Sequence, residues 1–221
     1  VTGGVTLLLK SSCGAVTGCG VEAFFDNVSI TFVSQVAATA PTVAAPTPPT
    51  RVAGDVISVF SGAYTDIAGS NFFPDWGQST VVTTEVIAGD DTLKYASFNY
   101  EGTVLGGVQD ASAMTHLHID LWTADATVVK VSPIQNTGTV EFLVSLTPIS
   151  AGWNSYDIPI ADFTGMTWVD IKELKFDGQA GVNPSTIYLD NIYFYKEAAA
   201  IATVPTVAAP TPPTRVAGDV I

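Results

Sequence analysis

Residues 51–197 alternate between apolar and polar side chains over short runs, with the period of two that is typical of β-strands. Glycine, proline, asparagine and aspartate separate the runs, and no convincing helical period occurs between them. Because strands without crossover helices pair antiparallel, we predict an all-β, antiparallel two-sheet sandwich of about nine strands. The predicted strands are 56–60, 81–87, 92–100, 114–122, 127–132, 139–146, 154–158, 171–176 and 186–195.

The run 114–122 contains the largest group of candidate ligand-binding side chains. Its alternation places aliphatic residues on one sheet face and His116, His118, Asp120 and Trp122 on the other. Imidazole, carboxylate and indole groups suit a polar ligand, so these four are candidate ligand-binding residues. Two alternatives stay open. The four form a hydrogen-bonded face that binds nothing, or the two histidines hold zinc, for which no third ligand is visible.

Two later strands, 139–146 and 171–176, also alternate, and their outward positions include Glu141, Glu173 and Lys175. We add Glu141 and Lys175 to the candidate ligand-binding residues, on the expectation that their strands lie beside the histidine-bearing strand.

The loop 61–79 is rich in glycine, aspartate and aromatic residues, and loops of this length in a compact domain are often functional. Its aromatic residues Tyr64, Phe72, Phe73 and Trp76 offer a second candidate site at one edge of the sandwich. The alternative is that its tryptophan belongs to the core or to a lid.

The segment 41–57, PTVAAPTPPTRVAGDVI, recurs letter for letter at 205–221, so the chain is a window of a tandem array with a period of 164 residues. The array is read as the C-terminal strands of one module (1–33), a linker (34–50), a complete module (51–197), a second linker (198–214) and the start of another module (215–221). Proline, alanine and threonine in the linkers favour an extended, polyproline-type conformation.

A formal net charge of −13 argues against a nucleic-acid partner, which would need a basic face. No run of about 20 apolar residues is present, so no membrane insertion is expected. Cys13 and Cys19 flank a glycine-rich loop, and a disulfide between them would place the protein outside the cytoplasm.

Several segments together resemble a known family. The closing run TIYLDNIYFY and the earlier WNSYDIPIADF, with DVISVFS, DWGQST and LHIDLWTAD, are similar to galactose-binding-like jelly-roll modules. Such modules occur in tandem in secreted bacterial glycoside hydrolases and in surface glycan-binding proteins. The resemblance implies a jelly-roll sandwich in an extracellular or cell-surface bacterial protein, and a polysaccharide ligand of the β-glucan or algal kind.

The resemblance also implies a structural Ca²⁺ ion, because the aspartate of the family's terminal Asp-Asn pair often holds one. Asp190, and Asp26 in the preceding module, match that position, and Asp66 and Asn71 are further candidate ligands. The alternative is that Asp190 caps loop amides by hydrogen bonds.

No catalytic pattern is found: no carboxylate pair with the spacing of a glycosidase, no nucleophile elbow and no phosphate loop. We therefore expect a non-catalytic, polysaccharide-binding module. The rival hypothesis is a structural repeat of a surface fibre, stalk or adhesin, whose modules and linkers pack against each other or against identical chains.

Overall fold

The computed structural model describes residues 40–179 and 185–197, and these form two antiparallel sheets without an α-helix. The predicted all-β, two-sheet sandwich is confirmed. No helix of the described part is long and apolar enough to cross a membrane. The strands are β1 Val56–Phe60, β2 Val81–Ile87, β3 Asp90–Phe98, β4 Tyr100–Gln109, β5 His116–Thr123, β6 Lys130–Gln135, β7 Val144–Ser145, β8 Gly152–Pro159, β9 Ile171–Asp177 and β10 Ser185–Tyr195, with 3-10 helices η1 Ala53–Asp55 and η2 Ile160–Asp162.

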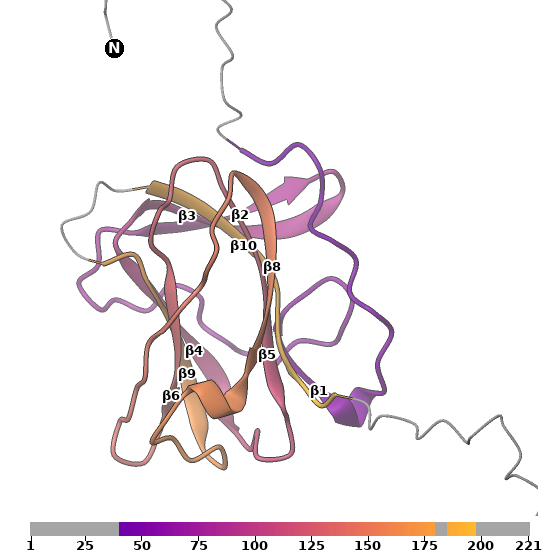
Figure 1. The fold of residues 1–221 in the computed structure, drawn as a ribbon, viewed down its shortest axis with the longest axis vertical. Coiled ribbons are helices and arrows are strands. Elements are labelled where there is room, and N and C mark those ends of the chain that lie inside the picture. The colour runs from indigo at the N-terminus through magenta and orange to yellow at the C-terminus, as the bar shows by residue number, and fades with distance from the viewer. Residues whose placement is uncertain (1–39, 180–184, 198–221) are drawn as a thin grey trace, which may run out of the picture. The chain divides into compact units, whose positions relative to one another are not determined.

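The first sheet, here called sheet A, has the strand order β2-β3-β10-β5-β8, and β1 pairs with the second half of β10. The other sheet, sheet B, has the order β4-β9-β6-β7. Figure 1 shows the two layers, with β4, β9 and β6 on one side and β5, β8 and β10 on the other. Strand β10 is the centre of sheet A, because it pairs with β3, β1 and β5.

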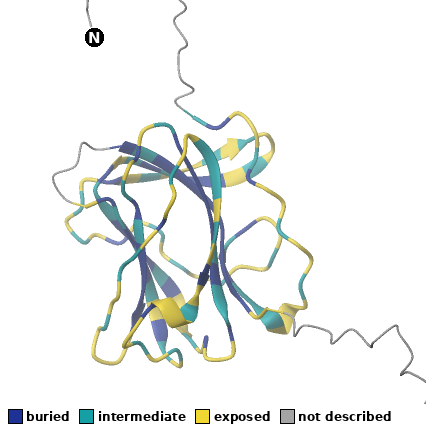
Figure 2. Ribbon diagram, in the orientation of Figure 1, coloured by how far each residue is buried: buried dark blue, intermediate teal, exposed yellow. Residues whose placement is uncertain are grey.

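The core fills the space between the sheets, where the buried faces of the strands lie (Figure 2). Leu117, Ile119 and Leu121 of β5 are fully buried there, as the alternation predicts. Leu174 and Phe176 of β9 join them from sheet B, which leaves Glu173 and Lys175 of β9 facing outward. The burial of these apolar faces is the main force that holds the two sheets together.

The predicted strand 92–100 is wrong at its end, because the chain changes sheets there. Strand β3 pairs with β10 in sheet A, whereas β4 pairs with β9 in sheet B. Asn99 makes the corner: its Oδ1 accepts hydrogen bonds from the Thr80 backbone N–H and hydroxyl, at 3.2 and 3.0 Å. The glycines of β4 hid this tenth strand from the sequence pattern.

Most of the predicted strand 139–146 is not β-strand. Only β7 pairs with β6 as a strand, and Glu141 forms an isolated bridge with Ile134. The Phe142 backbone N–H donates to the Ser132 hydroxyl instead of to a backbone carbonyl, which interrupts the ladder.

Several predictions lie outside the described residues: the preceding module's strands 1–33, Cys13, Cys19 and Asp26, the second linker 198–214 and the start of the next module 215–221. Of the first linker, residues 40–50 are described, and residues 41–50 lie along the outer face of sheet A, beyond β5 and β10 as seen in Figure 1. We call residues 41–50 the strap.

Gly106 of β4 tests how tightly the loop 61–79 is packed. An added Cβ at Gly106 would lie 1.9 Å from the backbone oxygen of Ala68, so Gly106→Ala must push the loop away. We expect a loss of about 1–3 kcal/mol in the free energy of unfolding, measured by urea denaturation. Gly54→Ala is the control, since nothing lies within 4 Å of its added Cβ. Equal midpoints for both variants would contradict this packing.

Candidate functional site

The four polar residues of β5 share the outer face of sheet A, as the alternation predicts. Asp120 is 1% exposed and Trp122 is 6% exposed, while His116 and His118 are half-buried. A face that is exposed to a ligand would leave these groups accessible. Here neighbouring side chains and the strap cover most of them.

His118 lies between two carboxylates. Its Nδ1 is 2.7 Å from Asp157 Oδ1, and its Nε2 is 3.5 Å from Asp120 Oδ1. Burial opposes the charged form of the imidazole, but the hydrogen bonds to both carboxylates outweigh it and raise the pKa of His118 to about 9. The histidine is therefore a cation at neutral pH that neutralises its own neighbours, and its ring stacks on Tyr193 at 4.7 Å.

The aromatic groups of this face are also occupied by neighbours within sheet A. Trp122 packs edge-on against Tyr188, and the His116 ring stacks on Tyr195 at 5.1 Å. Tyr64, from the long loop, lies edge-on against Tyr193 at 4.9 Å. The structure therefore brings His116, His118, Asp120 and Trp122 together, but in a packed face whose groups satisfy one another.

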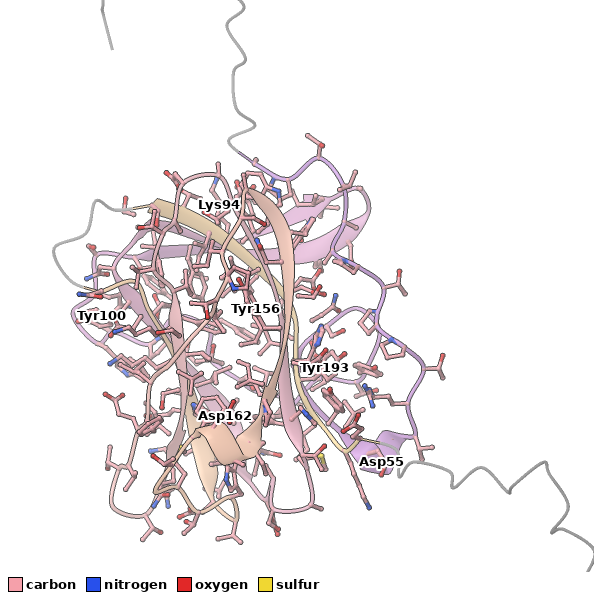
Figure 3. All side chains as sticks on the ribbon, viewed as in Figure 1. Asp55, Lys94, Tyr100, Tyr156, Asp162 and Tyr193 are labelled. Carbon is pink, nitrogen blue, oxygen red and sulfur yellow. The ribbon has the colours of Figure 1, made fainter. Side chains whose placement is uncertain are left out.

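Glu141 and Lys175 lie on the opposite side of the sandwich, outside sheet B. They line a groove of about 220 Å³ together with Trp76, Tyr100, Ile134 and Glu173. Figure 3 shows Tyr100 on this side of the molecule and Tyr193 on the sheet A side. The six ligand-binding residues predicted from the sequence thus fall into two groups separated by the core.

Gly102 of β4 makes the groove possible. An added Cβ at Gly102 would lie 2.1 Å from ring carbons of Trp76, so the indole rests directly on the glycine backbone. Tyr100, two residues earlier on the same face, holds the loop in place by donating its hydroxyl to the Trp76 backbone oxygen at 2.8 Å. Trp76 and Tyr100 are both half-buried, so each keeps part of its ring surface accessible.

Charged side chains line the rest of the groove. Lys175 Nζ lies 3.4 Å from Glu141 Oε1 and 3.5 Å from Asp177 Oδ2. Glu173 is the next outward residue of β9 and is only partly buried. Aromatic faces beside carboxylates and an ammonium group can stack on the C–H face of a sugar while bonding its hydroxyls.

The four loop aromatics do not form one site. Tyr64 lies on the sheet A side, and Phe72 packs edge-on against Phe60 beside the core. Phe73 is 52% exposed, and Trp76 lines the sheet B groove. Within the loop, Trp76 alone contributes to that groove.

Asp190 of β10 is fully buried, and its Oδ2 has no hydrogen-bond partner. Burial raises the pKa of Asp190 to about 7, and the negative charges of Asp90, Asp120 and Asp66 add to the effect. Its other oxygen accepts the backbone N–H of Asn191. A buried carboxylate with a free oxygen and three acidic neighbours is a place where a cation would lower the free energy.

Of the two further candidate calcium ligands, Asp66 lies near the Asp190 carboxylate and Asn71 does not. Asp66 contributes to the local negative charge, and its Oδ1 accepts from the Ser58 hydroxyl and the Ser61 backbone N–H. Asn71 lies elsewhere, where its backbone pairs with Val104 of β4. Among the described residues no three acidic, histidine or cysteine side chains surround one metal-sized point, so a bound Ca²⁺ would also need carbonyl, hydroxyl or water oxygens.

One protein-family model matches part of this chain. A family model described as carbohydrate binding domain 30 matches residues 99–196, which run from the sheet-changing corner through β10. This match confirms the resemblance to a carbohydrate-binding module. No curated protein matches the chain.

Among solved structures, the chain is similar to the family 11 carbohydrate-binding module of the cellulase Lic26A-Cel5E of Clostridium thermocellum. The identity is 17%, the TM-score is 0.46, and the match covers 64% of this chain and 95% of that one. A family 29 carbohydrate-binding module is similar at 14% identity and a TM-score of 0.46, over 63% of this chain and 86% of that one.

Sequence reasoning overlooked Tyr100 and Glu173 as groove residues and placed Trp76 only in a loop-edge site. Tyr100 was placed at the end of the predicted strand 92–100. The available signal was Gly102, because a glycine inside a strand often marks the close approach of another group.

The raised pKa of Asp190 predicts a pH dependence of stability. The folded protein keeps this proton up to about pH 7, whereas the unfolded chain releases it near the ordinary aspartate pKa of 3.8, so the stabilisation is lost as pH rises between the two. In EGTA, raising the pH from 5 to 8 should lower the free energy of unfolding of both proteins. We expect the fall to be about 2 kcal/mol smaller for Asp190→Asn than for the original protein. His118 changes stability in the same direction in both proteins, so their difference isolates Asp190. Parallel pH profiles would contradict the prediction.

Proposed function

We propose that the module binds polysaccharide without cleaving it, as part of a larger secreted or cell-surface protein. The observation that carries this proposal is the groove on sheet B, where Trp76 and Tyr100 present partly accessible rings beside Glu141, Glu173 and Lys175. The family-model match to a carbohydrate-binding domain supports the same function for residues 99–196.

The charge of the groove favours an uncharged glycan. Among the described residues that line the groove, Lys175 is the one cation. It lies 3.4 Å from Glu141 and 3.5 Å from Asp177, and Glu173 also lines the groove. A sulfated or uronic-acid polymer would meet net negative charge there. A neutral β-glucan would meet only hydroxyl-bonding groups and aromatic faces.

Truncation of Trp76 tests the groove. We expect Trp76→Ala to weaken binding of a soluble neutral glucan at least about tenfold, measured by calorimetry or affinity electrophoresis, because the stacking surface is lost. Trp153→Ala is the matched control: it removes another half-buried indole, from β8 on the opposite sheet, and should leave binding unchanged.

A panel that includes neutral glucans, mannans and charged polymers separates the two functional classes. If none is bound by the original protein while concentration-dependent polymers form, the structural-repeat hypothesis replaces this one. If Trp153→Ala loses binding and Trp76→Ala does not, the ligand lies on sheet A.

We also propose that Ca²⁺ binds at Asp190 and stabilises the module. The free Oδ2 of this buried carboxylate and its raised pKa support the proposal. Ca²⁺ at pH 8 should raise the melting temperature relative to EGTA by several degrees, and Asp190→Asn should abolish the difference. Asp162→Asn, which changes an exposed acid in η2, should retain it. Identical melting of the original protein in both solutions would exclude a stabilising site.

A further inference from the structure

The strap contacts the module through backbone carbonyls at every third residue. Trp153 Nε1 donates to the Val43 oxygen at 3.0 Å, Asn191 Nδ2 donates to the Pro46 oxygen at 3.0 Å, and the Tyr64 hydroxyl donates to the Pro49 oxygen at 2.6 Å. All three carbonyls face the module, and their spacing of three residues equals one turn of a polyproline II helix. Val43, Pro46 and Pro49 therefore form one row of acceptors against sheet A.

The strap is also packed on that side. Pro41 and Ala45 are buried and Pro48 is half-buried, whereas Thr42, Thr47 and Thr50 are exposed. The donors come from three separate parts of the module: Trp153 from β8, Asn191 from β10 and Tyr64 from the long loop. This is how proline-rich peptides are recognised elsewhere, with tryptophan, tyrosine and asparagine donors meeting a preformed extended chain.

At its C-terminal end the strap continues into the sheet without a break. The Arg51 guanidinium carbon lies 3.8 Å above the centre of the Tyr195 ring, and η1 leads directly into β1. The 17 residues 41–57 thus act as one docking element, from the first buried proline to the start of β1.

We propose that this 17-residue segment is a recognition element for the outer face of sheet A, and that its identical copy at 205–221 binds the same face of a second copy of this module. Because the two segments have the same sequence, the second contains the same residues that make the acceptor row in the first, and Ala209 corresponds to the buried Ala45. The covalent connection of 41–57 to β1 gives it a high effective concentration, so it holds its own face. The second copy gains access when a face is free.

The prediction is that releasing the first copy makes the chain self-associate. Ala45→Asp places a carboxylate at a buried position next to Pro46, whose carbonyl is bonded to Asn191, and Asn191 in turn bonds Asp120. We expect the Ala45→Asp chain to be monomeric at low concentration and to form larger species as its concentration rises, in sedimentation velocity. The free peptide PTVAAPTPPTRVAGDVI should dissolve these species.

Two matched variants control the result. Ala45→Asp/Ala209→Asp should stay monomeric because both copies carry the change, and Thr47→Asp should behave as the original protein because Thr47 is exposed. Trypsin cleavage after Arg51, identified by fragment mass, reports release of the strap. If Ala45→Asp releases the strap, retains its β-sheet circular dichroism and neither associates nor binds the peptide, the proposal is overturned. It is equally overturned if Arg51 stays protected in Ala45→Asp.

A conservative pair tests the acceptor row in case Ala45→Asp does not fold. Trp153→Phe with Tyr64→Phe keeps an aromatic ring at both positions and removes two of the three donors. Cleavage after Arg51 should then be roughly tenfold faster than in the original protein, because two net hydrogen bonds are lost. An unchanged rate would show that the carbonyl row does not hold the strap.

Discussion

The structure depends on the side chain of Asn191, which sits in the irregular stretch at the centre of β10. The pairing of β10 with β5 shifts register between Asp190 and Tyr193, and Asn191 has the left-handed φ of 50° that asparagine tolerates better than most residues. Its amide donates to Asp120 Oδ2 and to the Pro46 carbonyl, while its oxygen accepts from Ser61. One buried amide thus joins the central strands, the strap and the long loop.

Much of the fold could be predicted from the alternation of apolar and polar residues, because a strand with one buried face needs an apolar side chain at every second position. Strands β1 and β2 have the predicted bounds, and the inward faces of β5 and β9 were identified correctly. Strand β4 was not found. Its glycines carry no side-chain pattern, and its start is set by Asn99, whose bonds to Thr80 come from a distant loop.

The candidate site was harder to predict, for a physical reason. Alternation assigns a side chain to a face but does not say which sheet holds the strand or what covers that face. His118 and Asp120 looked like a polar groove, yet their charges are matched by Asp157 and by each other. Nothing in the sequence distinguished Glu141 and Lys175 from those residues, yet they line an open groove. The β4 partner of Lys175 is Gly102, which has no side chain to fill the space where the Trp76 indole rests.

The position of the strap has a mechanical consequence. The chain reaches β1 only after passing the three carbonyl bonds of residues 43–49, which lie one after another along the path. Tension applied from the N-terminal side would load these hydrogen bonds one after another, starting with that of Val43, before any force reached the sheet. Their release would lengthen the tether by about 30 Å for ten extended residues, so the module carries a compliant segment that yields while both sheets stay intact.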